Sequence, residues 1–80
     1  MNWHNTLNEI YSKLNACGYS EISTDIHEGQ LSGGTGGEIF DIIISKLIAI
    51  KTNKPHVYII IKVEIDSIIE YGKSIGYLIK

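Results

Sequence analysis

The amino-acid sequence predicts an all-α domain, with one segment near the C-terminus that also fits a strand. Apolar side chains recur every three or four residues over residues 3–14 and 39–50, which is the period of one helix face. A Thr-x-x-Glu pattern at residues 35–38 has the form of a helix-capping box. Pro55 suits the first turn of a helix and disfavours helical backbone just before it. A chain of 80 residues forms one core, so we expect a single domain over residues 1–80.

The first helix is predicted from about Asn2 to Ala16. Its apolar positions share one face and are Trp3, Leu7, Ile10, Tyr11 and Leu14. Gly18 ends this helix, because glycine readily adopts positive φ just beyond a helix end. Cys17 is the only cysteine, and we expect it to be a small buried side chain rather than a nucleophile.

The second helix is predicted from Ser20 to Gln30. Ser20 is a suitable N-cap, and Glu21 lies in the first turn, where the helix dipole favours a negative charge. Its apolar positions would be Ile22, Ile26 and Leu31, while Gly29 weakens its last turn.

The third helix is predicted from about Gly36 to Thr52. Thr35 would accept a hydrogen bond from the N–H of Glu38, and the Glu38 carboxylate would accept one from the N–H of Thr35. Two adjacent apolar stripes follow, formed by Ile39, Ile43, Leu47 and Ile50 and by Phe40, Ile44 and Ile48. Such a wide apolar face predicts a central helix that is contacted on more than one side.

The segment after Pro55 is ambiguous. As a strand, Val57 to Ile65 would alternate, with Ile59, Ile61, Val63 and Ile65 on one face. As a helix, one stripe would contain Ile61, Ile65, Ile68, Gly72, Ile75 and Ile79. The helical pattern is longer, but Gly72 and Gly76 each cost about 1 kcal/mol inside a helix, which requires a reason such as close approach of another helix. Local pattern alone leaves helix and strand equally supported.

Charge is distributed unevenly along the chain. Residues 14–45 contain five acids and no lysine, whereas residues 46–80 contain six lysines and three acids. The acids of the first segment are Glu21, Asp25, Glu28, Glu38 and Asp41. Solvated surface is the default role for such a cluster, and docking of a basic protein is the next. There is no arginine in the chain, and arginine is the preferred residue for phosphate and guanine contacts, so we do not expect a nucleic-acid reader.

No motif predicts catalysis, a metal or a cofactor. The glycine-rich segment at residues 33–37 lacks the Gly-Lys-Ser/Thr ending of a phosphate-binding loop and has acidic neighbours. His4, His27 and His56 lack metal-ligand spacing. No Gly-x-Ser-x-Gly sequence is present. We therefore expect a protein that is not an enzyme, needs no cofactor and acts by binding another protein.

The composition also predicts a cellular location. A single cysteine closes no intramolecular disulfide, which fits a reducing compartment. The N-terminus lacks the basic region and apolar run of a signal peptide, and charged residues interrupt every apolar run long before the roughly 20 residues of a membrane span. We expect a cytoplasmic protein.

The ten residues from Leu31 to Phe40, Leu-Ser-Gly-Gly-Thr-Gly-Gly-Glu-Ile-Phe, resemble a loop and helix start of small all-helical bacterial immunity proteins. Those proteins accompany polymorphic or contact-dependent toxins, and the resemblance covers nearly the whole chain. It implies a four-helix bundle and favours the helical interpretation of the last segment. It also implies a cytoplasmic inhibitor that binds a cognate toxin, with no catalytic residues. The isoleucine-rich last segment and its two glycines depart from the family pattern.

Under this interpretation the five acids are the candidate partner-binding residues, and the toxin would be a protein with a basic surface, such as a nuclease. A self-associating structural or adaptor module is the alternative, suggested by the apolar excess of the last two long helices. A small transcription regulator with a helix-turn-helix is disfavoured by the acidic centre and the absence of arginine.

Overall fold

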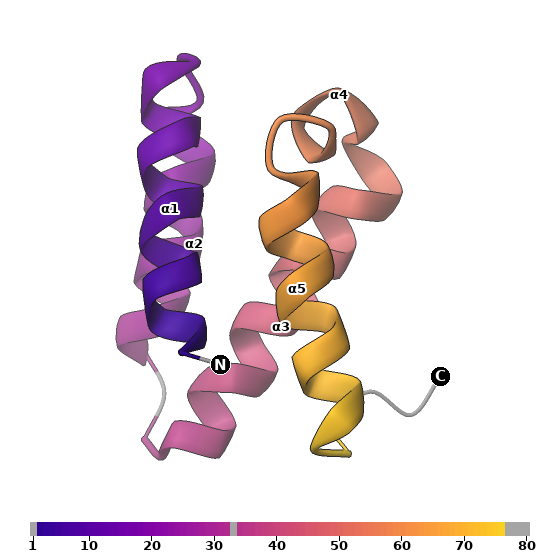
Figure 1. Cartoon of the computed structure of the whole chain (residues 1–80). Coiled ribbons are helices and arrows are strands. Elements are labelled where there is room, and N and C mark those ends of the chain that lie inside the picture. The colour runs from indigo at the N-terminus through magenta and orange to yellow at the C-terminus, as the bar shows by residue number, and fades with distance from the viewer. Residues whose placement is uncertain (1, 33, 77–80) are drawn as a thin grey trace.

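Four long helices and one short helix form the protein, as shown in a computed structural model that describes residues 2–32 and 34–76 (Figure 1). The helices are α1 (Trp3–Ala16), α2 (Ser20–Ser32), α3 (Gly36–Asn53), α4 (Pro55–Tyr58) and α5 (Lys62–Ser74). The described residues contain no strand, which confirms the all-α prediction. No helix among them is long and apolar enough to cross a membrane.

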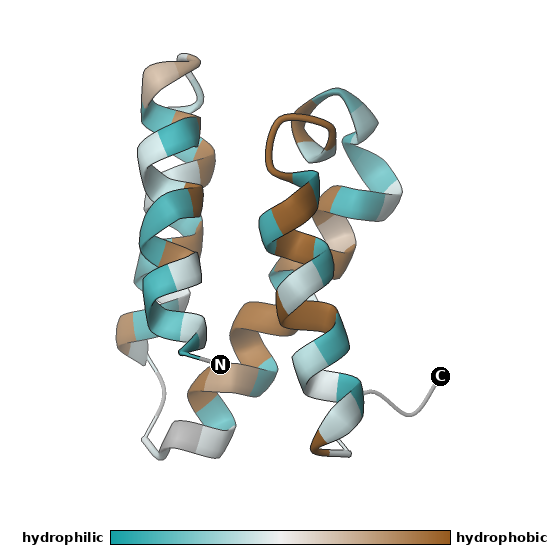
Figure 2. Ribbon diagram, viewed as in Figure 1, coloured by the Kyte–Doolittle hydropathy of each residue, from teal (hydrophilic) through white to brown (hydrophobic). Residues whose placement is uncertain are grey.

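The long helices pack in a closed circuit of neighbours. α1 contacts α2 and α5, while α3 contacts α2, α4 and α5 (Figure 1). The wide apolar face of the third helix predicted these several contacts. A helix with neighbours on more than one side must carry apolar residues over much of its circumference, and Figure 2 shows the hydrophobic residues of α3 where it crosses α5.

One core fills the space between the helices. Its fully buried members come from all five helices or their ends and include Leu7, Ile10, Leu14, Ile26, Ile43, Leu47, Val57, Ile61, Ile65 and Ile68. Burying a side chain of this size stabilises the folded state by about 1.5–3 kcal/mol before the cost in chain entropy. The predicted apolar faces of α1 and α3 supply much of this core.

Local hydrogen bonds fix the helix starts. The Asn2 side chain accepts from the N–H groups of His4 and Asn5 at the start of α1. At the start of α3, the Thr35 hydroxyl oxygen accepts from the Glu38 N–H at 3.2 Å, as the sequence predicts. The Glu38 carboxylate accepts from the Thr35 hydroxyl at 3.2 Å rather than from its backbone N–H. The second hydrogen bond of the capping box therefore joins the two side chains and does not involve the Thr35 backbone.

The strand alternative for Val57 to Ile65 is wrong. Ile61 and Ile65 are fully buried, but Ile59 and Val63 are each 72% exposed, whereas a strand would place all four on one face. The chain instead leaves α4 through a tight turn, with the N–H groups of Ile60 and Ile61 donating to the carbonyls three residues earlier. Helix α5 then begins at Lys62.

The helical stripe of this segment is confirmed only as far as Gly72. Ile75 lies just beyond α5 and is exposed, and Ile79 lies outside the described residues. A Cβ at Gly72 would lie 2.6 Å from Ile44 Cδ1, so α5 does approach α3 closely there. Gly76 follows the helix end and has a φ of +84°, a conformation that glycine adopts at little cost.

Two predicted core positions are exposed. Leu31 is 71% exposed, because five residues after Ile26 the helix has turned about 140° away from the buried face. Gly29, three residues after Ile26, takes the buried position instead. Cys17 is also exposed, since it lies beyond the last turn of α1, where the chain reverses through Gly18 with a φ of +86°.

Candidate functional site

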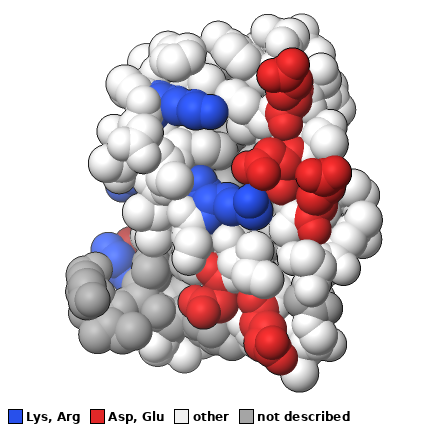
Figure 3. Space-filling view, turned by 180° about the vertical axis from the view of Figure 1, so that it is seen from behind, with Lys and Arg blue, Asp and Glu red and all other residues white. Residues whose placement is uncertain are grey.

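The five acidic candidate residues lie on α2 and on the first turns of α3. Glu21, Asp25 and Glu28 are spaced four and three residues apart, so they share one face of α2. Glu38 and Asp41 are three residues apart at the start of α3, which packs on α2. All five are exposed. We call them the acidic band, and Figure 3 shows the acidic side chains running down one side of the molecule.

Two members of the acidic band are engaged within the protein. Asp25 forms an ion pair of 3.1 Å with Lys46 of α3. Glu38 takes part in the cap of α3 with Thr35. Their charges therefore already have local partners.

The other three members have no polar contact within the part of the chain that the structure describes. Within the described part of the chain, Glu21, Glu28 and Asp41 form no hydrogen bond or ion pair through their side chains. Carboxylates of one sign, held on two packed helices, produce a negative potential that attracts basic molecules and accelerates their association. The structure brings these residues to one side of the molecule (Figure 3).

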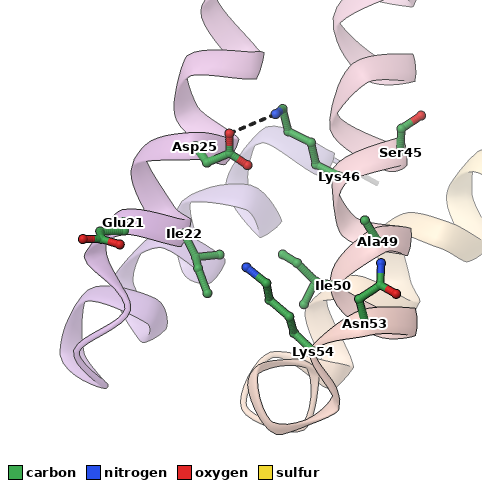
Figure 4. A pocket seen from close by; sticks show the side chains of 9 residues that line it. All are labelled: Glu21, Ile22, Asp25, Ser45, Lys46, Ala49, Ile50, Asn53 and Lys54. Carbon is green, nitrogen blue, oxygen red and sulfur yellow. Dashed lines mark hydrogen bonds and ion pairs between the residues drawn. The ribbon is translucent and has the colours of Figure 1, made fainter.

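A groove of about 570 Å³ lies between α2 and the second half of α3 (Figure 4). Ile22, Ala49 and Ile50 supply its apolar surface. Glu21 and Asp25 lie on the α2 wall, and Lys46 and Lys54 lie on the α3 side, with Ser45 and Asn53 completing the lining. Figure 4 shows the Lys54 side chain reaching from the end of α3 into the space between Ile22 and Ile50.

Sequence reasoning missed this groove. Its signal is the pair of small residues Ser45 and Ala49, one turn apart on α3, which leave room beside α2. That signal has meaning only once the register of α2 against α3 is known. The register is antiparallel: Asp25 pairs with Lys46, and the backbone of Gly29, further along α2, approaches Ile42 and Lys46.

A second polar cluster joins the last three helices. The Tyr58 hydroxyl donates to Asp66 Oδ1 at 2.6 Å, and Lys62 Nζ donates to Oδ2 at 3.0 Å. Lys51 Nζ lies 3.6 Å from Asp66 Oδ1 and 5.4 Å from the centre of the Tyr58 ring. These bonds, the Tyr58 hydroxyl foremost, hold the pKa of Asp66 below its usual value. The cluster ties α3, α4 and α5 together.

The histidines lie apart and against aromatic rings. His4 stacks on Trp3, His27 packs edge-on against Tyr11, and His56 lies near Tyr19. Among residues 2–32 and 34–76, no three His, Cys, Asp or Glu side chains gather closely enough to hold a metal ion.

The chain matches no protein-family model, no curated protein and no solved structure.

Proposed function

We propose that this chain is a cytoplasmic inhibitor of the immunity type, which binds a cognate secreted bacterial toxin domain stoichiometrically and neutralises it. The observation that carries the proposal is the acidic band, in which Glu21, Glu28 and Asp41 have no ionic partner within the described residues. A basic protein surface supplies the missing partners. The resemblance of the segment Leu31 to Phe40 to immunity proteins supports the same function.

The charge of the band suggests which toxins it suits. A nuclease carries lysine and arginine side chains where it binds the phosphates of its substrate. Carboxylates spaced along α2 and α3 offer such a surface a competing set of negative charges. Occlusion of the substrate site then requires only tight protein–protein contact, and the inhibitor needs no chemistry of its own.

The direct test is co-expression with the product of the adjacent gene. Growth should be arrested by that gene alone and restored when both are present, and the two proteins should co-purify in equal amounts. A harmless neighbour that fails to co-purify would contradict the immunity function.

A pair of charge variants tests the acidic band itself. Glu28→Lys with Asp41→Lys changes two exposed residues that make no side-chain bond in the described chain. Glu9→Lys with Glu70→Lys makes the same change in net charge at exposed sites outside the band. The first variant should slow association at least tenfold and lose most of its salt dependence, whereas the control should stay close to wild type. Equal effects of both variants would refute a specific role for the band.

A further inference from the structure

The groove between α2 and α3 has walls of opposite charge. Glu21 and Asp25 border it on α2, and Lys46 and Lys54 border it on α3 (Figure 4). Asp25 and Lys46 are paired across one end at 3.1 Å. Glu21 and Lys54, at the other end, form no ion pair within the described residues. The open end of the groove thus holds one free carboxylate, one free ammonium and an apolar surface between them.

We propose that this groove is an interface between two copies of the chain. A two-fold axis parallel to the groove and lying in the interface places the acidic wall of one copy over the lysine wall of the other. A single such rotation satisfies both walls at once, because each contact occurs twice. Glu21 of each copy then meets Lys54 of the other.

The register of the helices supports this pairing. Asp25 of α2 lies opposite Lys46 of α3. Because the two helices are antiparallel, Glu21, one turn before Asp25, lies near the level of Ile50, one turn after Lys46. The Lys54 side chain reaches back to that level (Figure 4). Glu21 and Lys54 are therefore at similar heights along the groove on opposite sides, which is what a two-fold axis along it requires.

The apolar surface gives the contact its attraction. Ile22 of each copy would meet Ala49 and Ile50 of the other copy across the axis, and these side chains would lose contact with water. A stable interface buries about 800 Å² on each partner, a large share of the 4691 Å² exposed by this small protein. The groove is smaller than that, so the dimer should be weak, concentration-dependent and sensitive to salt.

Self-association and toxin binding share Glu21 and Asp25 but otherwise use different parts of the surface. Glu28 and Asp41 belong to the acidic band but do not line the groove. Their lysine variants test the proposed inhibitor function and should leave the dimer intact. Variants of Glu21 and Lys54 test the dimer, so the two proposals can fail separately.

The experiment is sedimentation of the purified protein from about 10 μM to about 1 mM, the range expected for a weak interface. The wild-type mass should rise from 8.9 kDa toward twice that value and fall back in high salt. Glu21→Lys and Lys54→Glu should each weaken the dimer about tenfold, because each places two like-charge contacts in the interface. An equimolar mixture of the two single variants should dimerise again, since each then supplies the charge that the other lacks.

Three outcomes would overturn the proposal. One is a wild-type protein that stays monomeric throughout the range. Another is a dimer that persists in both single variants, which would place the interface elsewhere. The third is a mixture that remains monomeric although both variants keep the wild-type circular dichroism and melting temperature. The double variant Glu21→Lys with Lys54→Glu should dimerise as the wild type does and provides an internal control.

Discussion

Gly72 shows how one residue sets the distance between two helices. A Cβ there would lie 2.6 Å from Ile44 Cδ1 and 3.4 Å from Phe40 Cε2, both in the core. Gly72→Ala gains about 1 kcal/mol in helix propensity but crowds a packed interior at a cost of about 1–3 kcal/mol. We expect a net loss of about 1 kcal/mol in the free energy of unfolding, measured by urea denaturation.

Gly29→Ala is the matched control for that substitution. The atom nearest to its added Cβ would be Lys46 Cε at 2.6 Å, in a flexible, partly exposed side chain that can shift by loosening its ion pair with Asp25, and Ile42 Cγ2 would follow at 3.1 Å. Gly29→Ala should therefore destabilise the protein less than Gly72→Ala does, because the atom that must give way is not in the core. A stabilised Gly72→Ala variant would contradict the close packing of α5 on α3.

Tyr11 provides a residue-scale test at alkaline pH. Its hydroxyl donates to Gln30 Oε1 at 2.7 Å, and burial raises its pKa from 10.0 to about 12. A raised pKa stabilises the fold fully below pH 10, and this contribution is lost as the pH rises from 10 toward 12. Absorbance titration of the tyrosines should show one ionisation at about pH 12, and Tyr11→Phe should remove this late step. A variant that keeps the late step would show that another tyrosine is responsible.

Helices α1 and α3 could be predicted from sequence almost to the residue, while α5 could not. The prediction of Gly36 to Thr52 for the third helix differs from α3 by one residue, because a cap, a wide apolar stripe and a proline all agree. The last segment shows apolar alternation at residues 59–65 and a helical stripe through Gly72, with glycine counting against the helix. In the structure Gly72 lies against Ile44 and Phe40 of α3, a tertiary contact that offsets the cost of the glycine and that the local pattern does not contain.

The cluster around Asp66 makes an element-scale prediction about acid stability. The Tyr58 hydroxyl is the main cause of the lowered pKa of Asp66, with Lys62 and Lys51 adding to it. A lowered pKa contributes stability above the ordinary pKa of about 3.9, and that contribution is lost as the pH falls through the folded-state value. Tyr58→Phe should therefore lower the melting temperature at pH 7 more than at pH 2–3.

Carboxyl NMR titration of Asp66 is the direct measurement of that effect. Its pKa should rise in Tyr58→Phe toward the ordinary value of an aspartate, because Lys62 remains at 3.0 Å but the 2.6 Å bond from the hydroxyl is gone. Tyr19→Phe is the control, since Tyr19 lies outside this cluster. An unchanged Asp66 pKa in Tyr58→Phe would remove the hydroxyl as its cause.

At the scale of the molecule, the acidic band could be predicted and the groove beside it could not. The spacing of Glu21, Asp25 and Glu28 already places them on one face of any helix. The groove depends on how two helices are aligned, since Ile22 and Ile50 border it only in the antiparallel register of α2 and α3. Such tertiary register is absent from the periodicity of either helix alone.

An ion pair joins the first and last long helices of the bundle. Lys13 of α1 donates to Glu64 Oε2 of α5, and the side chains are 46% and 6% exposed, respectively. Within the described residues, Glu64 Oε1 accepts no hydrogen bond. Removing the lysine leaves a buried carboxylate without its counter-charge, whereas removing the carboxylate leaves a half-exposed lysine that water can solvate.

Replacing Lys13 and replacing Glu64 should therefore lower the free energy of unfolding by unequal amounts, although both substitutions break the same ion pair. We expect Lys13→Met to lower the free energy of unfolding by about 2 kcal/mol and Glu64→Met to change it by less than about 1 kcal/mol. The double variant should resemble Glu64→Met, because a neutral side chain at position 64 no longer needs the lysine. Urea denaturation of the four proteins gives the coupling energy. If Lys13→Met and Glu64→Met cost the same and their effects add, the pair contributes nothing to holding α1 against α5.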